Sequence, residues 1–337
     1  MKRINCLVTG STGLVGAHLL AHLLQSQQFT VRAMKRKSSK MDTLRYVFGF
    51  YTDDVSGYVD SISWVDGDVL DTHSLLTAMD GVQVIFHCAA DVFIGNDTAN
   101  SVLQTNVQGT KNMVDAALSI QVQTFCHVSS VAAIGKDLIA SLSDENSPWD
   151  MNKTHTAYAQ SKYDAEQVVL AIPQQKMRVI IVNPGVILGV NNKNTGSSSV
   201  IFLAKKGFPF YIHGGSGYVD VRDVCRAMLL LVQRNVTHER FVLVGENCTT
   251  KQLLRYFSEG LDTPRPSILV PKPLLMLVGY LAEIVSSLFK IKSNFDRKAV
   301  QVASQTSYYN AEKIQKRFNF QFTPLQQCVK DICMYVK

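Results

Sequence analysis

The 337-residue chain contains seven cysteines but no C-x-x-C pair, and its cysteines do not have the spacing of a metal site. An odd number of scattered thiols does not make a complete disulfide framework. Disulfides also persist mainly in oxidising compartments, whereas the cytosol keeps thiols reduced. We therefore expect reduced, mostly buried cysteines in a cytoplasmic protein.

Long runs of one charge sign are also missing. The net charge is +7, from 34 lysines and arginines against 27 acidic residues, without a long basic run. Charge of this kind is typical of a solvated surface, so we expect no nucleic-acid partner. A hydrophobic content of 46% with 18% charged residues is instead typical of a soluble globular protein with a sizeable core.

No apolar run is long enough to be a clear membrane span. At the N-terminus, Asn5, Thr9 and three glycines interrupt the stretch that a signal peptide would need, so a first strand is the better interpretation. The most apolar segment, 273–289, is at or below the roughly 17–25 residues of a spanning helix and contains Glu283. Its helical periodicity predicts an amphipathic helix that packs on the protein's own core, with a membrane-surface contact or a homodimer interface as alternatives.

The patterns that are present alternate between strands and helices. Apolar strand patterns cover 4–10, 29–34, 61–69, 82–90, 124–133 and 177–187, and helical patterns cover 13–25, 71–79, 102–118 and 155–172. This alternation predicts an α/β fold with a doubly wound parallel sheet, because helices then bury both faces of the apolar strands. One more strand, 240–245, is predicted to return to the sheet.

The second half of the chain predicts a smaller, discontinuous C-terminal lobe. We assign residues 1–184, with a returning segment of about 218–248, to the domain that contains the parallel sheet. Residues 185–217 and 249–337 are assigned to a substrate-binding lobe. The polar stretch 191–199 predicts a surface loop over the site.

A glycine-spaced turn, TGSTGLVG, follows the first predicted strand and opens the first helix. Glycines let the backbone turn tightly and approach a pyrophosphate, which then lies at the helix N-terminus. The spacing is G-x-x-G-x-x-G rather than G-x-G-x-x-G, and a plain tight turn is the alternative. The residues of this turn that we predict to contact a dinucleotide are Gly10, Thr12, Gly13, Leu14, Val15 and Gly16.

The chain has no aspartate or glutamate between Gln27 and Lys40, around the end of the second strand. A carboxylate there would hold the ribose 2′-hydroxyl of NAD, whereas basic side chains suit the 2′-phosphate of NADP. Arg32, Lys35 and Arg36 occupy this region, so we predict NADP(H) as the preferred cofactor and NAD(H) as the alternative. A solvated basic loop would have the same composition.

Two other strand ends are predicted to face the same ligand. Asp68, beside Val69 at the end of the third strand, could accept a hydrogen bond from the adenine amine, or it could cap a helix or loop. Ala89 and Ala90, at the end of the fourth strand, are small enough for a cofactor to lie close. Small residues also serve packing, and the two roles are compatible.

Tyr158 and Lys162 lie four residues apart in YAQSK, on one face of a predicted helix. An ammonium beside a phenol favours the phenolate and lowers the pKa of the tyrosine. Such a tyrosine can give a proton to a carbonyl oxygen or take one from a carbinol, which predicts hydride-transfer chemistry. His18 and His22 also lie four apart, but no third ligand accompanies them, so we predict no metal site.

The order of these motifs resembles that of the extended short-chain dehydrogenases/reductases, the NAD(P)-dependent epimerase/dehydratase family. TGSTGLVG, GDVLD, HCAA, the TN–GT stretch at Asn106, VSSVAA, YAQSK and NPGVILG follow one another over nearly the whole chain. DENSPW, NPG and YVDVRDVCRAM are most similar to the branch of the dihydroflavonol reductases and hydroxysteroid dehydrogenases. The resemblance implies a Rossmann fold with a smaller substrate lobe.

The resemblance also implies a role for each matching residue. Tyr158 would be the acid/base, and Lys162 would bind the nicotinamide ribose and lower the Tyr158 pKa. Ser130 would hydrogen-bond the substrate oxygen, while Ser129 would face the other way on its strand. Asn106 would be a polar residue close to the site. The nicotinamide end would be lined by Pro184, Gly185 and Val186.

We interpret the chain as an NADP(H)-dependent oxidoreductase that reduces a ketone or aldehyde of a small, partly apolar molecule, or oxidises the alcohol. Val131 and Ala132 stand where sugar-nucleotide dehydratases carry an Asp–Glu pair, which argues against dehydration. An NAD-dependent sugar-nucleotide epimerase is the alternative among enzymes. A non-catalytic dinucleotide-sensing protein is the alternative from another class.

Overall fold

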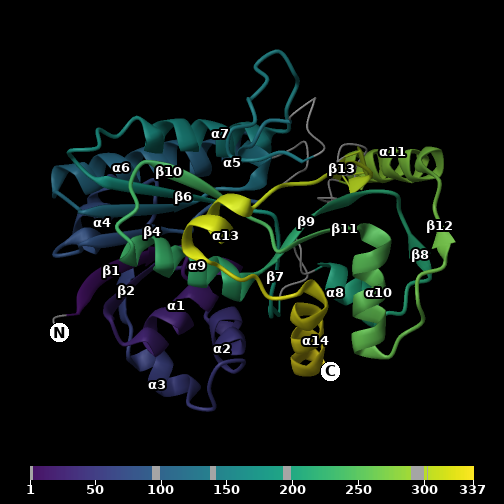
Figure 1. Cartoon of the computed structure of the whole chain (residues 1–337), viewed down its shortest axis with the longest axis horizontal. Helices are drawn as coiled ribbons and strands as arrows, with labels where there is room; N and C mark the ends of the chain where they lie inside the picture. The colour runs from purple at the N-terminus through teal and green to yellow at the C-terminus, as the bar shows by residue number, and fades with distance from the viewer. Residues whose placement is uncertain (1–2, 93–98, 137–141, 193–198, 290–299, 302) are drawn as a thin grey trace.

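The computed structural model describes residues 3–92, 99–136, 142–192, 199–289, 300–301 and 303–337. Its central sheet has seven parallel strands in the order β10-β6-β5-β4-β1-β2-β3 (Figure 1). Their bounds are β1 (Ile4–Thr9), β2 (Phe29–Lys35), β3 (Ser63–Asp66), β4 (Val84–His87), β5 (Thr124–Val128), β6 (Arg178–Pro184) and β10 (Glu239–Leu243). Strands β1 to β6 lie in the order that is typical of a doubly wound sheet. This arrangement confirms the predicted fold class.

Helices cover both faces of this sheet (Figure 1). One face carries α1 (Leu14–Ser26), α2 (Asp42–Phe48), α3 (Val55–Asp60) and α9 (Val221–Gln233). The other carries α4 (Thr72–Met79), α5 (Ala99–Leu103), α6 (Gly109–Ser119) and α7 (Ala157–Leu170). Helices α2 and α3 were not predicted, although Leu44, Val47 and Phe48 of α2 have helical spacing and are buried.

Successive residues of one strand belong to two different cores. Cys6 and Val8 of β1 pack in the core that contains α1 and α9, whereas Leu7 between them packs with Leu75 and Met113 from α4 and α6. This division arises because side chains alternate between the two faces of a strand. Both cores need apolar residues, so the strands have near-continuous apolar sequences.

A smaller part of the molecule lies beside the carboxyl ends of β5 and β6 and is built from later segments. Its strands are β7 (Val186–Leu188), β8 (Phe210–Tyr211), β9 (Gly215–Asp220), β11 (Glu246–Thr249), β12 (Ile268–Leu269) and β13 (Thr306–Ser307), and its helices are α8 (Ser199–Lys205), α10 (Thr250–Leu261), α11 (Lys272–Phe289) and α14 (Leu325–Val336). Helix α13 (Glu312–Phe318) packs instead on β10 of the central sheet. Strand β9 lies between β11 on one side and β7 and β13 on the other. The chain then returns to the central sheet, where β10 pairs with β6, as predicted for 240–245.

Two predicted elements differ in their ends for identifiable reasons. The strand expected over 124–133 ends at Val128, because the Ser130 side chain accepts a hydrogen bond from the Ala132 amide and starts a short 3-10 turn, Val131–Ala133. The helix expected over 102–118 is interrupted by a π-helical turn, Gln104–Gln108. Single π-helical turns occur frequently at functional sites.

Helix α11 departs from the expected packing. Leu274, Leu277 and Val278 are 51%, 53% and 45% exposed, so these residues of the predicted apolar stripe do not pack on the protein's own core. No helix within the described residues is long and apolar enough to cross a membrane. Most of the predicted polar loop, residues 193–198, lies outside the described part of the chain.

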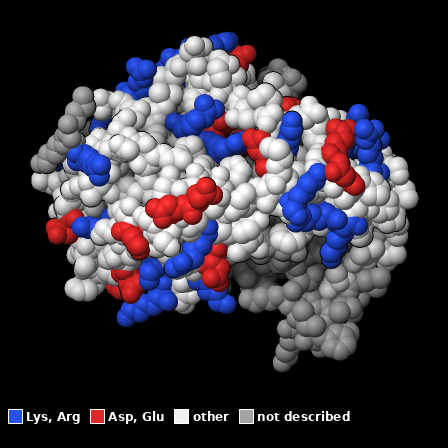
Figure 2. Space-filling model, turned by 90° about the horizontal axis from the view of Figure 1, so that it is seen from below, with Lys and Arg blue, Asp and Glu red and all other residues white. Residues whose placement is uncertain are grey.

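The cysteines are reduced and mostly buried, as expected, and the surface carries charges of both signs. All seven cysteines are free; six are buried and Cys88 is partly buried. Burial raises the pKa of the Cys6 and Cys88 thiols to about 12, so both stay protonated at neutral pH. Figure 2 shows basic and acidic side chains interspersed on one face of the molecule.

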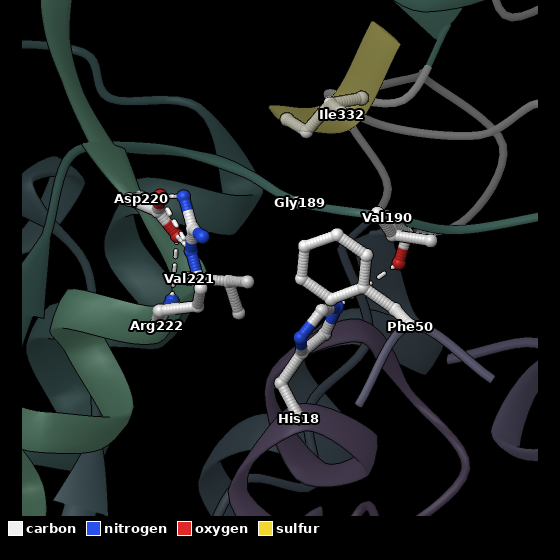
Figure 3. Close-up of a pocket in the computed structure, with 8 residues that line it drawn as sticks. All are labelled: His18, Phe50, Gly189, Val190, Asp220, Val221, Arg222 and Ile332. Atoms are coloured by element: carbon white, nitrogen blue, oxygen red, sulfur yellow. Dashed lines mark hydrogen bonds and ion pairs between the residues drawn. The ribbon is translucent and has the colours of Figure 1, made fainter. Parts of the chain in front are cut away.

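A small cavity of about 10 Å³ marks the contact between the two parts of the molecule (Figure 3). His18 of α1 lies at its edge and is fully buried. Its Nε2 donates to the Val190 carbonyl at 3.0 Å, so its Nδ1, 2.5 Å from the Tyr51 hydroxyl, accepts from that group. Neutral His18 thus joins α1 to the segment after β7. Within the described residues, no three His, Cys, Asp or Glu side chains are grouped to hold a metal.

The burial of His18 predicts a loss of stability in mild acid. Burial lowers the pKa of His18 from 6.5 to about 4. Between these values the unfolded chain binds a proton that the folded chain does not, so the free energy of unfolding falls as the pH drops from about 6.5 to about 4. We expect His18 to contribute on the order of 1–3 kcal/mol to this loss in urea unfolding. His22, His87 and His127 add to the loss, because burial lowers their pKa values as well. His18→Gln should reduce the pH dependence by the contribution of His18, whereas the same change at exposed His73 should not; equal slopes in both variants would contradict the assignment.

Candidate active site

The glycine turn lies between the carboxyl ends of β1 and β4. Gly10 has φ +63°, and a Cβ there would lie 2.7 Å from the Ala89 amide nitrogen. A Cβ on Gly16 would lie 2.2 Å from the Gly10 carbonyl oxygen, so both positions require glycine. Gly13 begins α1 as its N-cap, is exposed and has no side chain that caps the helix. The first amides of α1 are therefore open to an anionic ligand.

Three side chains that the sequence analysis did not single out fix this turn. The Thr9 hydroxyl hydrogen-bonds His87 Nδ1 at 2.8 Å and accepts from the Ala89 amide at 3.2 Å. The Ser11 hydroxyl donates to the Met34 carbonyl at 2.7 Å. These contacts hold the ends of β1, β2 and β4 in one arrangement. Ala89 thus lies directly beside Gly10, as a shared dinucleotide site requires.

The basic residues near the end of β2 do not all lie where the sequence suggested. Arg32 donates to the Ala78 and Asp80 carbonyls at 2.9 and 2.7 Å, so its guanidinium serves the C-terminal end of α4 rather than the strand end. Lys35 pairs with Asp66 at 2.8 Å. Arg36 is exposed and has no ion pair within the described residues. Of the three predicted phosphate contacts, Arg36 is thus the best placed and Arg32 is corrected to a structural role.

The third-strand residues have local roles in the structure. Strand β3 ends at Asp66, and Asp68 lies in the following turn, where its Oδ1 accepts from the Leu70 amide at 3.0 Å. The side chain of Val69 is buried against Gly109. The predicted contact of Asp68 and Val69 with adenine stays a prediction.

Helix α7 brings Tyr158 and Lys162 to the end of β5. Thr156 caps the helix by accepting from the Ala159 amide at 3.1 Å. Lys162 is 3% exposed, and its Nζ donates to the Val128 carbonyl at 3.0 Å. The Ser130 hydroxyl lies close enough to the Tyr158 phenol to act against the rise of its pKa. Ser130, Tyr158 and Lys162, which are 32 residues apart in sequence at most, are thus brought together at one strand end.

The electrostatics of this group differ from the expectation. Burial raises the pKa of the Tyr158 phenol, and the nearby Ser130 hydroxyl opposes that rise only in part. The predicted lowering of the Tyr158 pKa by Lys162 is therefore not observed. Burial also lowers the pKa of Lys162 to about 8, while Glu166 and Cys88 act in the opposite direction. At neutral pH the phenol is protonated and the lysine is mostly charged.

Asn106 lies in the π-helical turn and joins the site to α7. Its amide nitrogen donates to the Ser161 hydroxyl at 2.9 Å and to the Asp91 carbonyl at 3.0 Å. Its carbonyl oxygen accepts from the Asp91 amide at 2.7 Å. Ser161 in turn donates to the Tyr158 carbonyl. The residue predicted to lie close to the site therefore supports the backbone that carries Tyr158.

The NPG segment lies at the crossing between the two sheets. Pro184 ends β6, Gly185 donates to the Leu243 carbonyl at 3.0 Å, and Val186 begins β7. A Cβ on Gly185 would lie 2.3 Å from the Gly217 carbonyl oxygen, so only glycine lets β6 pass this close to β9. Asn183, just before Pro184, donates to the Ser130 carbonyl at 3.0 Å.

Glu166 and Asn183 contact the predicted site but were not predicted. Both are fully buried, and the Asn183 amide donates to Glu166. A signal for Glu166 was present in the sequence, because it lies four residues beyond Lys162 and so on the same helix face. Asn183 had no such signal, since its approach to Ser130 depends on the pairing of β5 with β6.

The residues present fit a bound dinucleotide. The uncapped N-terminus of α1 offers amide donors for a pyrophosphate, and Gly13 leaves the approach open because a Cβ there would meet only the Gly10 carbonyl oxygen, at 3.2 Å. Ala89 and Ala90 are partly exposed at the end of β4. Ligands of doubly wound sheets bind at the carboxyl ends of the strands, where these residues and Lys162 lie.

Both the sequence and the fold are similar to known proteins. The family described as "NAD dependent epimerase/dehydratase family" matches residues 6–245. A "Putative dihydroflavonol 4-reductase" of Synechocystis sp. is 32% identical over 331 residues, which cover 96% of this chain and 92% of that protein. A "3beta-hydroxysteroid-dehydrogenase/decarboxylase isoform 1" of Arabidopsis thaliana is 26% identical, with 96% and 78% covered. The crystal structure of gox2253 has a TM-score of 0.79 at 27% identity and covers 99% of this chain and 98% of its own.

Proposed function

The chain belongs to the NAD-dependent epimerase/dehydratase family, and on that premise we propose that it reduces the carbonyl group of a small, partly apolar molecule with NADPH. As a member with relatives named reductases and dehydrogenases, it is an NAD(P)-dependent oxidoreductase. The reductive direction, the NADP preference and the site Ser130, Tyr158 and Lys162 are our proposals.

The observation that carries the proposal is the meeting of Ser130, Tyr158 and Lys162 at the carboxyl end of β5, on the same sheet edge as the glycine turn. The raised pKa of Tyr158 supports the reductive direction, because a protonated phenol at neutral pH is the form that can donate a proton. A tyrosine on a helix without Ser130 and Lys162 beside it would not support this proposal.

Each residue has a distinct task in this chemistry. The bound dinucleotide would supply the hydride at the nicotinamide ring. Tyr158 donates its phenolic proton to the oxygen on which charge develops, and the Ser130 hydroxyl stabilises that charge by a hydrogen bond. Lys162 would hold the nicotinamide ribose through its ammonium group. The buried position of Lys162 strengthens its field, because water is largely excluded there.

The substrate class rests on the relatives and on the apolar character of the second lobe. Relatives are named for a dihydroflavonol and for a 3beta-hydroxysteroid, and both names describe largely apolar ring systems. Phe208 and Phe210 in the second lobe are 50% and 41% exposed, which leaves aromatic surface for such a molecule. We propose an aromatic or alicyclic ketone or aldehyde.

Cofactor preference gives the first test of this function. We expect NADPH to bind at least about tenfold more tightly than NADH, a difference of about 1.4 kcal/mol or more, because Arg36 is free to meet a 2′-phosphate. Isothermal titration calorimetry with both dinucleotides measures the ratio. Arg36→Ala should reduce it by weakening NADPH binding alone. Arg45→Ala, which removes an exposed cation from α2, should leave the ratio unchanged. Equal affinities of the native protein for both dinucleotides would refute the NADP preference.

The alternative enzyme is an NAD-dependent sugar-nucleotide epimerase, which the pairing of Lys35 with Asp66 favours because it lowers the positive charge near the ribose. Such an enzyme would purify with tightly retained NAD, whereas a reductase would exchange NADPH freely. Mass spectrometry of the dinucleotide released on denaturation separates the two. A non-catalytic sensing protein would bind the dinucleotide and turn over no carbonyl compound.

A further inference from the structure

A buried carboxylate lies one helical turn beyond Lys162, and the proposed chemistry gives it no task. Glu166 of α7 is 0% exposed. Removing a carboxylate from water is costly unless charged or polar partners surround it. Glu166 has such partners on two strands of the central sheet, Asn183 on β6 and Arg240 on β10.

The first partner connects Glu166 to the backbone of the site. Asn183 of β6 donates one short hydrogen bond to Glu166 Oε1 and another, at 3.0 Å, to the Ser130 carbonyl. A single amide group therefore joins the carboxylate to Ser130. If the carboxylate moves, the Ser130 carbonyl loses the donor that Glu166 holds in place.

The second partner balances the charge of Glu166 from the other side. Arg240 of β10 lies 3.3 Å from Glu166 Oε2, and its guanidinium also donates to the Glu145 carbonyl. Burial raises the pKa of Glu166, while Ser129, Arg240 and Asn183 oppose the rise. The ion pair with Arg240 and the hydrogen bond from Asn183 favour the ionised carboxylate.

Lys162 faces titratable groups from three elements. His87 and Cys88 lie at the end of β4, His127 lies on β5 and Glu166 lies on α7 itself. Burial lowers the pKa of His87 to about 3 and that of His127 well below 6.5, and it raises the pKa of Cys88 to about 12. These three groups are neutral between pH 6.5 and 9. Glu166 is therefore the group that supplies negative charge to Lys162 in this pH range.

We propose that Glu166 is a positioning residue for the active site: it keeps Lys162 protonated at neutral pH and, through Asn183, holds the backbone at Ser130. The charge effect is a property of the folded protein and does not depend on the identity of the substrate. Its consequence for turnover rests on the proposed function. The two parts can therefore be tested separately.

The charge effect can be measured without substrate or cofactor. The protein is labelled with ¹³C at the lysine Cε, and the Lys162 signal is assigned from its loss in Lys162→Arg. In the native protein we expect this signal to titrate near pH 8. In Glu166→Gln the midpoint should fall by about one unit or more, because a neighbouring opposite charge is lost while the amide oxygen can still accept from Asn183. An unchanged midpoint would overturn the proposal.

Two other variants guard against a purely structural explanation. Glu145→Gln removes a second buried carboxylate, one that accepts from the Val242 amide at 2.7 Å and does not contact the site residues. It should leave the Lys162 midpoint in place. Arg240→Gln should lower the midpoint, because it removes the cation that helps to keep the Glu166 carboxylate ionised. If Glu166→Gln does not fold, the direction of the Arg240→Gln shift decides: a rise or no change contradicts the proposal.

Dinucleotide binding then separates this inference from the proposed function. NADPH affinity of the native protein and of Glu166→Gln is measured by calorimetry from pH 6.5 to 9. We expect the affinity of the variant to decline at lower pH than that of the native protein, following the Lys162 midpoint. If neither protein binds NADPH, the proposed function fails while the titration result stands. If both bind with the same pH dependence, the link between Glu166 and the ribose site is refuted.

Discussion

Replacing Tyr158 by phenylalanine is expected to reduce the turnover of a carbonyl substrate with NADPH by about 10²–10⁴-fold. Phenylalanine keeps the aromatic ring and its packing, and it removes only the hydroxyl that lies close to Ser130. Dinucleotide affinity should change little, because the phenol donates to the substrate oxygen in the proposed reaction. Turnover is measured by NADPH oxidation with aromatic and alicyclic ketones, and affinity by calorimetry.

The same helix offers a matched control. Tyr163 of α7 stacks on Trp149 with a ring-centroid distance of 4.4 Å and an interplanar angle of 9°, and it takes no part in the proposed chemistry. Tyr163→Phe should therefore keep turnover close to that of the native protein. Near-native activity in Tyr158→Phe would show that another group donates the proton. A complete absence of turnover in the native protein with every carbonyl compound would favour the sensing alternative.

The pKa directions also bear on the direction of the reaction. Burial holds the Tyr158 phenol protonated at neutral pH, which suits reduction, where the residue must give a proton. In the oxidative direction the phenol must first lose that proton. Oxidation of the alcohol should therefore accelerate as the pH rises, whereas reduction should not.

The elements of the central sheet could be predicted because each has a local pattern. Apolar runs such as the one around Phe86, and the helical periodicity of α1 and α7, depend only on neighbouring residues. The glycine turn could be predicted for the same reason, since Gly10 and Gly16 lie where a Cβ would meet backbone. Local sequence therefore determines most of the site that faces the dinucleotide.

What escaped prediction depends on contacts between distant segments. Arg32 has the composition of a phosphate contact, but the approach of α4 to β2 gives its guanidinium two carbonyl partners instead. The pKa of Tyr158 depends on burial by residues from several elements, and so the proximity of Lys162 alone gave the wrong direction. The exposure of Leu274 and Leu277 likewise follows from where α11 lies and not from its periodicity.

Replacing Lys162 by alanine is expected to impair both dinucleotide binding and turnover. In the proposed complex the Lys162 ammonium would donate a charge-assisted hydrogen bond to the nicotinamide ribose. Such bonds contribute about 1.5–3 kcal/mol. Its loss should weaken NADPH binding by roughly 10–100-fold. Turnover at saturating NADPH should also fall, by about 10²–10⁴-fold, because the nicotinamide ribose loses the contact that would orient it for hydride transfer. Calorimetry and steady-state kinetics separate the two effects.

Two control variants, Lys153→Ala and Lys162→Arg, test whether these losses require a lysine at position 162. Lys153→Ala removes an exposed lysine that pairs with Asp150 at 3.0 Å, and it should change neither quantity. Lys162→Arg keeps a positive charge, but the wider guanidinium cannot occupy the buried position in which Nζ donates to the Val128 carbonyl. We expect this variant to recover only part of the affinity and little of the turnover. Normal turnover in Lys162→Ala with weakened binding would limit Lys162 to dinucleotide affinity and would refute its role in orienting the nicotinamide for hydride transfer.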